Sequence, residues 1–296
     1  LAKLAADKFN IKSFERHVTK GEFITEVPKI LDCMDQPSID GINTWFVSKA
    51  TKERGYKVAL SGVGGDELFC GYPSFRQIPN IRRISSIISI LPRFEKLSGL
   101  LNPSLKKIFN VNKMSKLSSY ADSITRLFLL KRSLFLPEEI KKIIPQDLYA
   151  EGIKKVLEDE LLLFLDSDFN STNSQISFLE SNLYLCNQLL RDSDWASMSH
   201  SVELRTPLVD YRLLRNISPL LADLKLGEGK KLLSKSPKIN VPKQIVNKKK
   251  TGFSLPMDLW VGDAIQSLDL DSKEIKFGDN WARKWSQVII NKNIDL

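Results

Sequence analysis

Residues 58–72, VALSGVGGDELFCGY, decide the fold class of this chain. The stretch opens with a short apolar run that is typical of a buried strand, and glycines follow at positions 62, 64 and 65. Glycine permits positive φ and lets a ligand approach the backbone closely. Asp66 and Glu67 come next, where acidic side chains favour the first turn of a helix. The stretch therefore predicts a strand, a loop that faces phosphate and a helix, with Glu67 supporting that helix.

The residues before this stretch alternate between helical and extended patterns. We predict helices over residues 1–9, 22–34 and 43–54, a short strand over 14–19 and a buried strand over 56–60. Helix and strand in alternation indicate a parallel α/β sheet. Binding sites in such sheets lie beyond the carboxyl ends of the strands, which is where residues 61–66 fall.

After Pro79 the pattern becomes largely helical. Apolar positions recur with helical spacing over residues 81–90, 120–135, 151–165 and 173–190, and a Lys- and Ser-rich stretch covers 102–119. Trp281 and Trp285, four residues apart, predict a last amphipathic helix. We therefore predict a partial α/β nucleotide-binding core over residues 1–78 and a large helical part over residues 79–296.

Composition excludes several classes of protein. The 296 residues are 42% hydrophobic and 27% charged, as in soluble globular proteins. The longest apolar run, at 161–165, is far shorter than the ~20 residues of a membrane span. The three cysteines are far apart, which predicts reduced thiols in a cytoplasmic protein and no disulfide framework. The two histidines are too few for a histidine-rich metal site, so we expect packing or surface roles for them.

The net charge of +9 is compatible with nucleic acid, an anionic surface or a small molecule that carries phosphate. Much of the excess lies in residues 225–250, KLGEGKKLLSKSPKINVPKQIVNKKK. No aromatic residue is interleaved there, as a platform for base stacking would require. We expect neither a nucleic-acid partner nor a membrane.

Three further stretches carry candidate functional residues. DQPSID, at 35–40, separates two predicted helices, and an ordinary structural turn is the favoured interpretation of its Asp and Pro residues. KKKTGFSLP, at 248–256, is either a solvated face or a turn that presents a lysine to phosphate. LRDSDWASMSHSVELRTPLVD, at 190–210, has apolar residues at helical spacing that predict core contacts, namely Trp195, Met198, Val202 and Leu204, with Pro207 ending the helix. Its charged residues form either a wet face or a buried polar network, and the candidates are Asp194, Glu203, Arg205 and Asp210.

Taken together and in order, these stretches resemble the motifs of the glutamine-dependent asparagine synthetases. SGVGGDELFCGY is similar to S-G-(D/E)-G-x-D-E-(L/V)-F-G-G-Y, and DQPSID is similar to D-x-P-x-x-D. RDSDWASMSHSVELRTPLVD resembles R-x-x-D-x-x-S-M-x-x-x-x-E-x-R-x-P-x-x-D, and KKKTGFSLPMDLW resembles K-x-G-F-x-x-P-x-x-x-W. The resemblance covers residues 1 to about 260, and four ordered motifs are far more specific than one glycine-rich loop.

The resemblance implies a fold, an activity and its cofactors. The fold would be an α/β core of the ATP pyrophosphatase type with a helical C-terminal part. The activity would be that of a ligase that adenylates the side-chain carboxylate of aspartate with ATP and Mg²⁺ and releases pyrophosphate. Ammonia would then displace AMP to give asparagine. That ammonia would come from a glutaminase domain on the same chain, through an internal tunnel.

The resemblance also implies roles for individual residues. Ser61 and Gly62 would contact the nucleotide. Asp66 would hold Mg²⁺ through pyrophosphate, and Lys250 would stabilise the transition state. Arg191 and Asp194 would orient phosphate or substrate. Glu203 and Arg205 would serve the structure.

The sequence departs from the pattern in ways that leave alternatives open. Val63 stands where the family usually has Asp or Glu, Trp195 where it often has Arg, and Cys70 where it usually has Gly. The family's pyrophosphate loop, S-G-G-x-D-S, does not occur in residues 1–296, and we expect it and the glutaminase domain upstream of Leu1. We therefore expect that this chain alone does not make asparagine. One alternative is adenylation or amidation of another small carboxylate, and another is a non-catalytic remnant or scaffold. A homodimer is an open alternative to a monomer.

Overall fold

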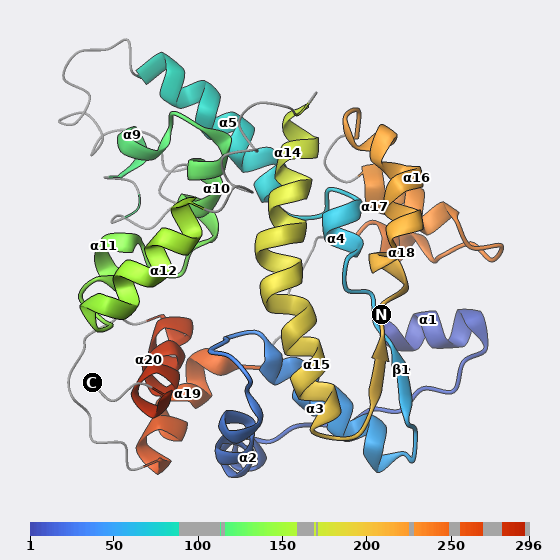
Figure 1. Ribbon diagram of the computed structural model, residues 1–296. Coiled ribbons are helices and arrows are strands. Elements are labelled where there is room, and N and C mark those ends of the chain that lie inside the picture. The colour runs from blue at the N-terminus through green and yellow to red at the C-terminus, as the bar shows by residue number, and fades with distance from the viewer. Residues whose placement is uncertain are drawn as a thin grey trace. The chain divides into compact units, whose positions relative to one another are not determined.

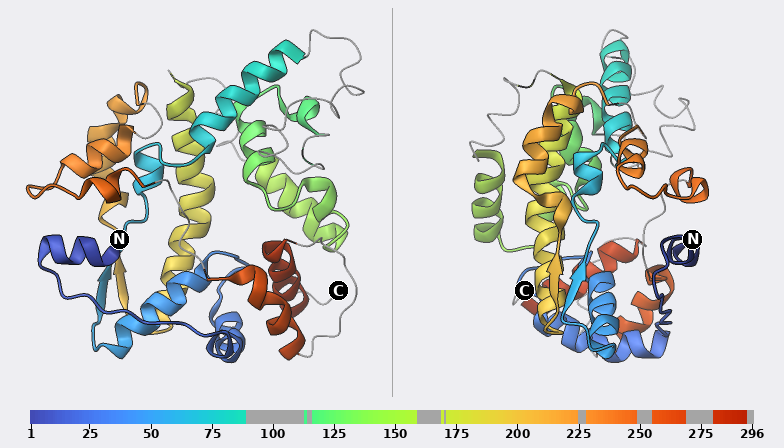
Figure 2. Two further views of the ribbon diagram at one scale, coloured as in Figure 1. Left: turned by 180° about the vertical axis from the view of Figure 1, so that it is seen from behind. Right: turned by 90° about the vertical axis from the view of Figure 1, so that its right-hand side faces the viewer.

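The computed structural model describes residues 1–88, 113, 116–158, 169, 171–224, 228–248, 255–268 and 280–293. Figures 1 and 2 show the helices and strands of the chain. The chain forms two compact units. The first unit contains residues 1–64, 183–210 and 230–296, and the second contains residues 65–182 and 211–229. The predicted division after residue 78 separates a nucleotide-binding part from a helical part, and it stays a prediction. Within the described residues, no helix is both long enough and apolar enough to cross a membrane.

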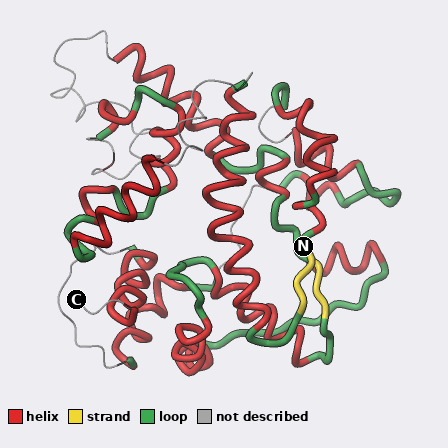
Figure 3. The backbone as a smooth tube through the Cα atoms, in the orientation of Figure 1, coloured by secondary structure: helices red, strands yellow, loops and turns green. Residues whose placement is uncertain are grey.

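The first unit holds a small parallel sheet. Strand β1 (Val58–Leu60) pairs with β2 (Glu203–Arg205), and Ala59 lies opposite Leu204. Figure 3 shows the two strands side by side in yellow among helices. The predicted α/β class with parallel strands is therefore confirmed, although the described residues are mostly helical.

Two predictions about strands are wrong. Residues 14–19 form no strand, because Thr19 instead caps the next helix and its side chain accepts a hydrogen bond from the backbone N–H of Glu22 at 3.2 Å. Strand β1 forms as predicted but is not buried, since the side chains of Val58 and Leu60 are 40% and 76% exposed. The apolar run of β1 had predicted that other elements would bury both faces of the strand, as is usual for parallel strands.

Besides its sheet, the first unit contains helices. They are α1 (Ala2–Phe9), α2 (Lys20–Cys33), α3 (Gly41–Glu53), α15 (Arg191–Met198), α18 (Lys243–Val246), α19 (Met257–Ser267) and α20 (Trp281–Asn293), with the 3₁₀ turn η2 (Pro207–Val209). Helix α17 (Glu228–Lys235) begins in the second unit, which ends at Gly229, and continues in the first unit from Lys230. The core cluster includes Phe23, Trp45, Trp195, Val261 and Trp285. Trp285 is fully buried there, which confirms the predicted last amphipathic helix.

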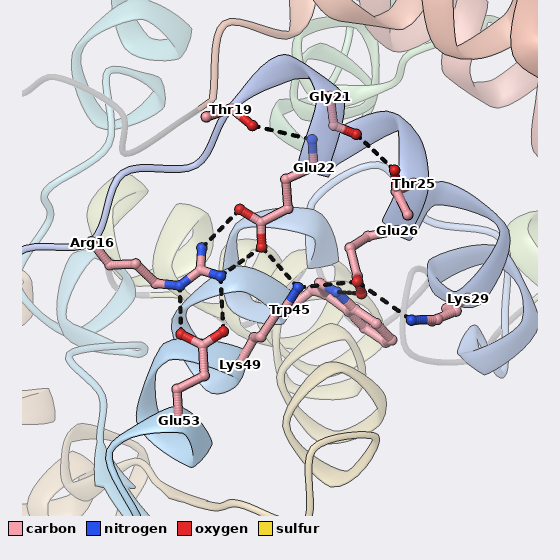
Figure 4. Close-up of polar contacts among 10 residues, drawn as sticks. All are labelled: Arg16, Thr19, Gly21, Glu22, Thr25, Glu26, Lys29, Trp45, Lys49 and Glu53. Carbon is pink, nitrogen blue, oxygen red and sulfur yellow. Dashed lines mark hydrogen bonds and ion pairs between the residues drawn. The ribbon is translucent and has the colours of Figure 1, made fainter.

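An ion-pair network fixes α2 against α3 and against the segment before α2 (Figure 4). Arg16 bonds Glu22 at 2.5 Å and Glu53 at 2.6 Å, while Lys49 bonds Glu22 at 2.7 Å and Glu26 at 3.0 Å. The hydrogen bonds from Arg16 lower the pKa of Glu22 to about 2. The network therefore attaches the segment before α2 to both helices through Arg16.

A close contact between α3 and α15 sets the spacing of the two helices. A Cβ atom added at Gly41 would overlap the six-membered ring of the Trp195 indole. Trp195 in turn lies 6.2 Å from Trp45, measured between ring centroids, and is buried. Only glycine at the start of α3 therefore allows this approach.

Helix α15 ends earlier than predicted. The apolar spacing predicted a helix through Leu204, but α15 stops at Met198 and Ser201 adopts a φ of 55°. This left-handed conformation ends the helix and turns the chain into β2. Val202 is buried as predicted, whereas Met198 is 57% exposed, so its predicted core role is wrong.

The second unit is helical. Its helices are α4 (Gly65–Leu68), α5 (Ser74–Ile88), α9 (Leu117–Tyr120), α10 (Ile124–Arg132), α11 (Pro137–Ile140), α12 (Gln146–Glu158), α14 (Thr172–Leu179) and α16 (Tyr211–Leu221). A π-helical stretch, η1 (Glu180–Leu190), continues α14 into α15. This confirms the predicted helical character, although α5 begins before Pro79. Most of the Lys- and Ser-rich stretch 102–119 and residues 159–165 lie outside the described residues.

Cys70 occupies a position whose backbone suits glycine. Its φ is 53°, in the left-handed region that glycine adopts without strain, and the resemblance places glycine here. The side chain is fully buried, and burial raises the pKa of its thiol to about 11. This cysteine is therefore a packing residue, and Cys33 and Cys186 are also free thiols.

We expect Gly41→Ala to destabilise the chain by about 1–3 kcal/mol, because the added methyl group would force α3 and α15 apart. Gly21→Ala is the matched control, since a Cβ atom there meets nothing within 4 Å in helix α2. The control should leave stability unchanged or raise it by up to about 1 kcal/mol. Urea unfolding of both variants measures the difference, and equal midpoints would contradict the proposed spacing role of Gly41.

Candidate functional site

The loop after β1 places Ser61 and Gly62 at the carboxyl end of the parallel pair. The backbone N–H of Ser61 donates to the carbonyl of Arg205 at 2.8 Å, which extends the pairing by one residue. The hydroxyl of Ser61 accepts a hydrogen bond from the N–H of Val63 at 3.2 Å and so forms a tight turn. This is the edge of a parallel sheet where ligands are generally bound.

The glycines of this loop serve different purposes. Gly64 has a φ of 92°, and a Cβ atom there would lie 2.7 Å from Cγ2 of Val209, so the fold itself requires glycine. Gly62 is exposed, its φ is not in the left-handed region, and a Cβ atom there would meet nothing within 4 Å. The fold of the described residues therefore does not require glycine at position 62.

Asp66 and Glu67 belong to the second unit, in the single turn of α4. Asp66 is half-buried, and its carboxylate packs so closely on Gly71 that an added Cβ atom would overlap it. Glu67 is 2% exposed and accepts a hydrogen bond from the hydroxyl of Tyr72 at 2.8 Å. Ser177 donates to the carbonyl of Glu67 at 2.9 Å. Glu67 therefore supports the structure, as expected, and Asp66 is the more accessible acid.

The structure brings together two of the stretches that the sequence singled out, residues 35–40 and 190–198. Asp192, which is 2% exposed, accepts hydrogen bonds from the hydroxyl of Ser38 at 2.5 Å and from the indole N–H of Trp195 at 3.0 Å. The indole N–H of Trp285 donates to the carbonyl of Ser38 at 3.2 Å. The last helix and α15 therefore both hold the DQPSID loop.

Further polar contacts fix the two ends of the same loop. The carboxylate of Asp40 accepts hydrogen bonds from the hydroxyl of Tyr184 at 2.9 Å and from the amide of Gln188 at 2.6 Å. Arg191 pairs with Asp35 at 3.0 Å, and both side chains are about half exposed. The interpretation of this loop as a turn therefore remains. In addition, polar side chains of the continuous helix that contains α15 bind both ends of the loop.

The faces of α15 differ in exposure. Arg191, Asp194 and Met198, which recur at helical spacing, are all exposed, whereas Asp192, Trp195 and Ala196 are buried. Glu203, Arg205 and Asp210 are also exposed, and Glu203 pairs with Arg205 at 2.8 Å on the surface. Of the two interpretations of these charged residues, the buried network is wrong. The solvent-exposed face holds for Asp194, Glu203, Arg205 and Asp210.

The sequence did not single out Asp192, the one buried carboxylate of α15. Burial raises its pKa to about 6, and the negative charges of Asp40 and Asp35 add to the rise, although the hydrogen bonds from Ser38 and Trp195 oppose it. Its spacing was a usable signal, because Asp192 precedes Trp195 by three residues and Ala196 by four, on one helix face. The role of Ser38 had no such signal, because it depends on a contact across more than 150 residues of sequence.

The remaining expectations concern Lys250, metal binding and the two histidines. Lys250 lies outside the described residues, so its role stays a prediction. Among the described residues, no group of three or more His, Cys, Asp or Glu side chains could hold a metal ion. His17 is exposed and His200 is buried with its ring 4.4 Å from Trp45, in agreement with surface and packing roles.

We expect Asp192→Asn to remove a pH dependence of stability. The unfolded carboxyl titrates near 3.8 and the folded one at about 6, so wild-type stability from this group is highest below pH 3.8 and falls as pH rises through 6. The difference between wild type and variant in free energy of unfolding should change by about 2–3 kcal/mol between pH 4 and pH 7. Urea unfolding across this range measures it, with Asp194→Asn as the exposed control. A constant difference between wild type and Asp192→Asn would contradict the burial of a charged carboxylate here.

Comparison with known proteins places these residues in context. The family model described as asparagine synthase matches residues 1–273. Asparagine synthetase (glutamine-hydrolyzing) 1 of Bacillus subtilis (strain 168) is 27% identical over 295 residues, which cover 92% of this chain and 44% of that protein. A putative asparagine synthetase (glutamine-hydrolyzing) of Mycobacterium tuberculosis (strain CDC 1551 / Oshkosh) is 24% identical over 272 residues, which cover 88% of this chain and 39% of that protein.

The chain thus spans less than half the length of these curated relatives. No solved structure matches it. The matched region includes the SGVGGDELFCGY loop, the DQPSID loop and α15, which are also the segments that the contacts described above hold in place. The chain belongs to the asparagine synthase family.

Proposed function

We propose that this chain is the synthetase part of an ATP-dependent amide-forming ligase that converts aspartate to asparagine with ammonia derived from glutamine. The observation that carries the proposal is Gly62, whose exposed backbone lies just beyond the carboxyl end of β1 although the fold does not require glycine there. A ligand that approaches the backbone closely would explain the glycine. Membership of the asparagine synthase family supports ATP as that ligand.

The residues present suit MgATP in their chemistry. Ser61 and Gly62 would hold the nucleotide through the open backbone of the loop. The half-buried Asp66 carries a carboxylate, the oxygen ligand that Mg²⁺ prefers, and Mg²⁺ commonly binds proteins through one or two carboxylates together with phosphate groups. When bound, MgATP would supply the adenylyl group that activates the carboxylate, with pyrophosphate as the leaving group.

Other residues of the chain would orient the reactants. Lys250 would place a positive charge near the phosphoryl oxygens, where negative charge develops. Arg191 and Asp194 share the exposed face of α15, and the pair with Asp35 would keep the guanidinium of Arg191 oriented for phosphate or substrate. The buried contact of Ser38 with Asp192 would hold the loop that carries Asp35.

We expect Gly62→Ala to impair the reaction without harming the fold. In the protein of complete encoded length, the methyl group should reduce pyrophosphate release from MgATP and aspartate by at least about tenfold, because it occupies the space of the nucleotide. The free energy of unfolding should stay the same or rise by up to about 1 kcal/mol. Gly21→Ala, which also adds a methyl group in open space, should leave pyrophosphate release unchanged and should leave the free energy of unfolding unchanged or raise it by up to about 1 kcal/mol. Unchanged pyrophosphate release in Gly62→Ala would contradict the placement of the nucleotide.

The acceptor carboxylate has a second candidate, because Val63 replaces the usual acid of the signature. A valine side chain can neither accept a proton nor bind a cation, so we propose another small carboxylate as the alternative substrate. Pyrophosphate release by the complete protein, measured across a panel of amino acids and sugar acids, separates the two. Release with aspartate supports the leading proposal, and release only with another acid supports the alternative. No release with any acid supports the scaffold interpretation.

We also propose that residues 1–296 by themselves form no asparagine, because they contain no S-G-G-x-D-S pyrophosphate loop. Incubation of the 296-residue chain with ammonia, aspartate and MgATP should therefore yield no asparagine above the amount formed without protein. Asparagine formation under these conditions would overturn this part of the proposal. The protein of complete encoded length, in the same assay, is the positive control.

A further inference from the structure

The helix that carries Asp66 cannot set its own position. Helix α4 is a single turn of four residues, and isolated helices of that length are not stable in water. The buried side chains of Leu68, Phe69 and Cys70 anchor the segment in the second unit by apolar packing. Apolar packing is not directional, so the orientation of the Asp66 carboxylate depends on the polar contacts around it.

The first polar contacts join Asp66 and Glu67 to the residues that follow α4. The backbone N–H of Gly71 donates to the carbonyl of Asp66 at 2.7 Å. The Asp66 carboxylate packs on Gly71 so closely that no Cβ atom would fit there. The hydroxyl of Tyr72 donates to the carboxylate of Glu67 at 2.8 Å. Tyr72 therefore closes the turn that runs from Asp66 to Gly71.

Tyr72 is itself held by a buried ion pair. The guanidinium of Arg132, at the end of α10, lies over the ring of Tyr72, 4.8 Å from its centroid. Arg132 pairs at 2.8 Å with Glu180, which is 0% exposed and also accepts a hydrogen bond from the hydroxyl of Ser74 at 2.5 Å. Burial raises the pKa of Glu180, and the positive charge of Arg132 opposes the rise. Because a buried charge without its partner is costly, Arg132 stays at Glu180 and hence over the ring.

These contacts form a continuous chain from Glu180 to Asp66. The chain runs from Glu180 through Arg132 to the ring of Tyr72. It continues from the Tyr72 hydroxyl to Glu67, the residue next to Asp66. All of its members lie in the second unit, and of these residues only Asp66 has a role in the proposed function. The ring and the hydroxyl of Tyr72 each have a partner, so the phenol is fixed at both ends.

We propose that Tyr72 is a positioning residue for Asp66. Arg132 fixes its ring and Glu67 fixes its hydroxyl, so the neighbouring Asp66 carboxylate stays where it would hold Mg²⁺ through pyrophosphate. Groups that support a metal ligand from behind commonly tune the affinity of the site for its metal. The inference rests on the proposed function, which gives Asp66 its role.

The test is Tyr72→Phe in the protein of complete encoded length, because this variant removes one hydroxyl and keeps the ring on Arg132. Pyrophosphate release from ATP and aspartate is measured across a range of free Mg²⁺ concentrations. We expect the Mg²⁺ concentration at half-maximal rate to rise about three- to tenfold, and the rate at saturating Mg²⁺ to change less than about twofold, because a displaced Asp66 would bind Mg²⁺ more weakly. Tyr149→Phe removes a hydroxyl from α12 of the same unit, outside this chain of contacts, and should leave both quantities unchanged.

Hydrogen exchange shows whether Tyr72 acts on the turn locally. In the 296-residue chain, Tyr72→Phe should speed exchange of the Gly71 amide, which donates to Asp66, about two- to tenfold. The amides of Ile176 and Leu179, buried in α14, should exchange at the wild-type rate. This measurement separates a local displacement from a general loss of stability, and it needs no activity.

The outcomes distinguish this inference from the proposed function. A higher Mg²⁺ requirement together with faster exchange at Gly71 supports the inference. An unchanged Mg²⁺ requirement in an active Tyr72→Phe variant would overturn it and leave the proposed function intact, as would exchange that rises equally at Gly71 and in α14. If the wild-type protein releases no pyrophosphate at any Mg²⁺ concentration, the proposed function fails, and this inference fails with it.

Discussion

The close approach of α3 and α15 at Gly41 is the constraint on which the first unit depends. The indole of Trp195 occupies the space that any larger residue at position 41 would need. Helix α3 leads within a few residues into β1, and α15 leads through the turn at Ser201 into β2. The contact between the two helices therefore helps to bring β1 and β2 together, and their backbone hydrogen bonds set the distance between the strands. The position of Ser61, bonded to the backbone of Arg205, follows from that pairing.

Asp192 adds a second constraint, electrostatic in nature. A carboxylate buried beside Trp195 is costly unless donors satisfy it, and Ser38 and the indole N–H are those donors. The DQPSID loop is therefore attached to α15 by a requirement for hydrogen bonds as well as by apolar packing. The same helix keeps Arg191 and Asp194 exposed on its other face, so one short helix combines attachment to the core with a face available to ligands.

The sequence predicted those features that depend on local pattern. Helices α2 and α3, β1 and the last helix follow from apolar spacing, and the order of four motifs predicted the family. It failed at two local backbone features and at one contact between distant residues. Thr19 became a helix cap instead of a strand residue, and Ser201 turned the chain before Leu204 could continue a helix. The buried acid proved to be Asp192, because charge pattern alone does not show which carboxylate meets Ser38.

The exposure of β1 has a consequence for the behaviour of this chain in solution. Among the described residues, each strand of the pair has one neighbouring strand and therefore one edge that pairs with no further strand, and the exposed Leu60 side chain adds apolar surface to β1. Such edges are templates for pairing with further strands, from the same or from other molecules. Because backbone hydrogen bonds and apolar contact would drive that association, it would grow with protein concentration and would not be suppressed by added salt.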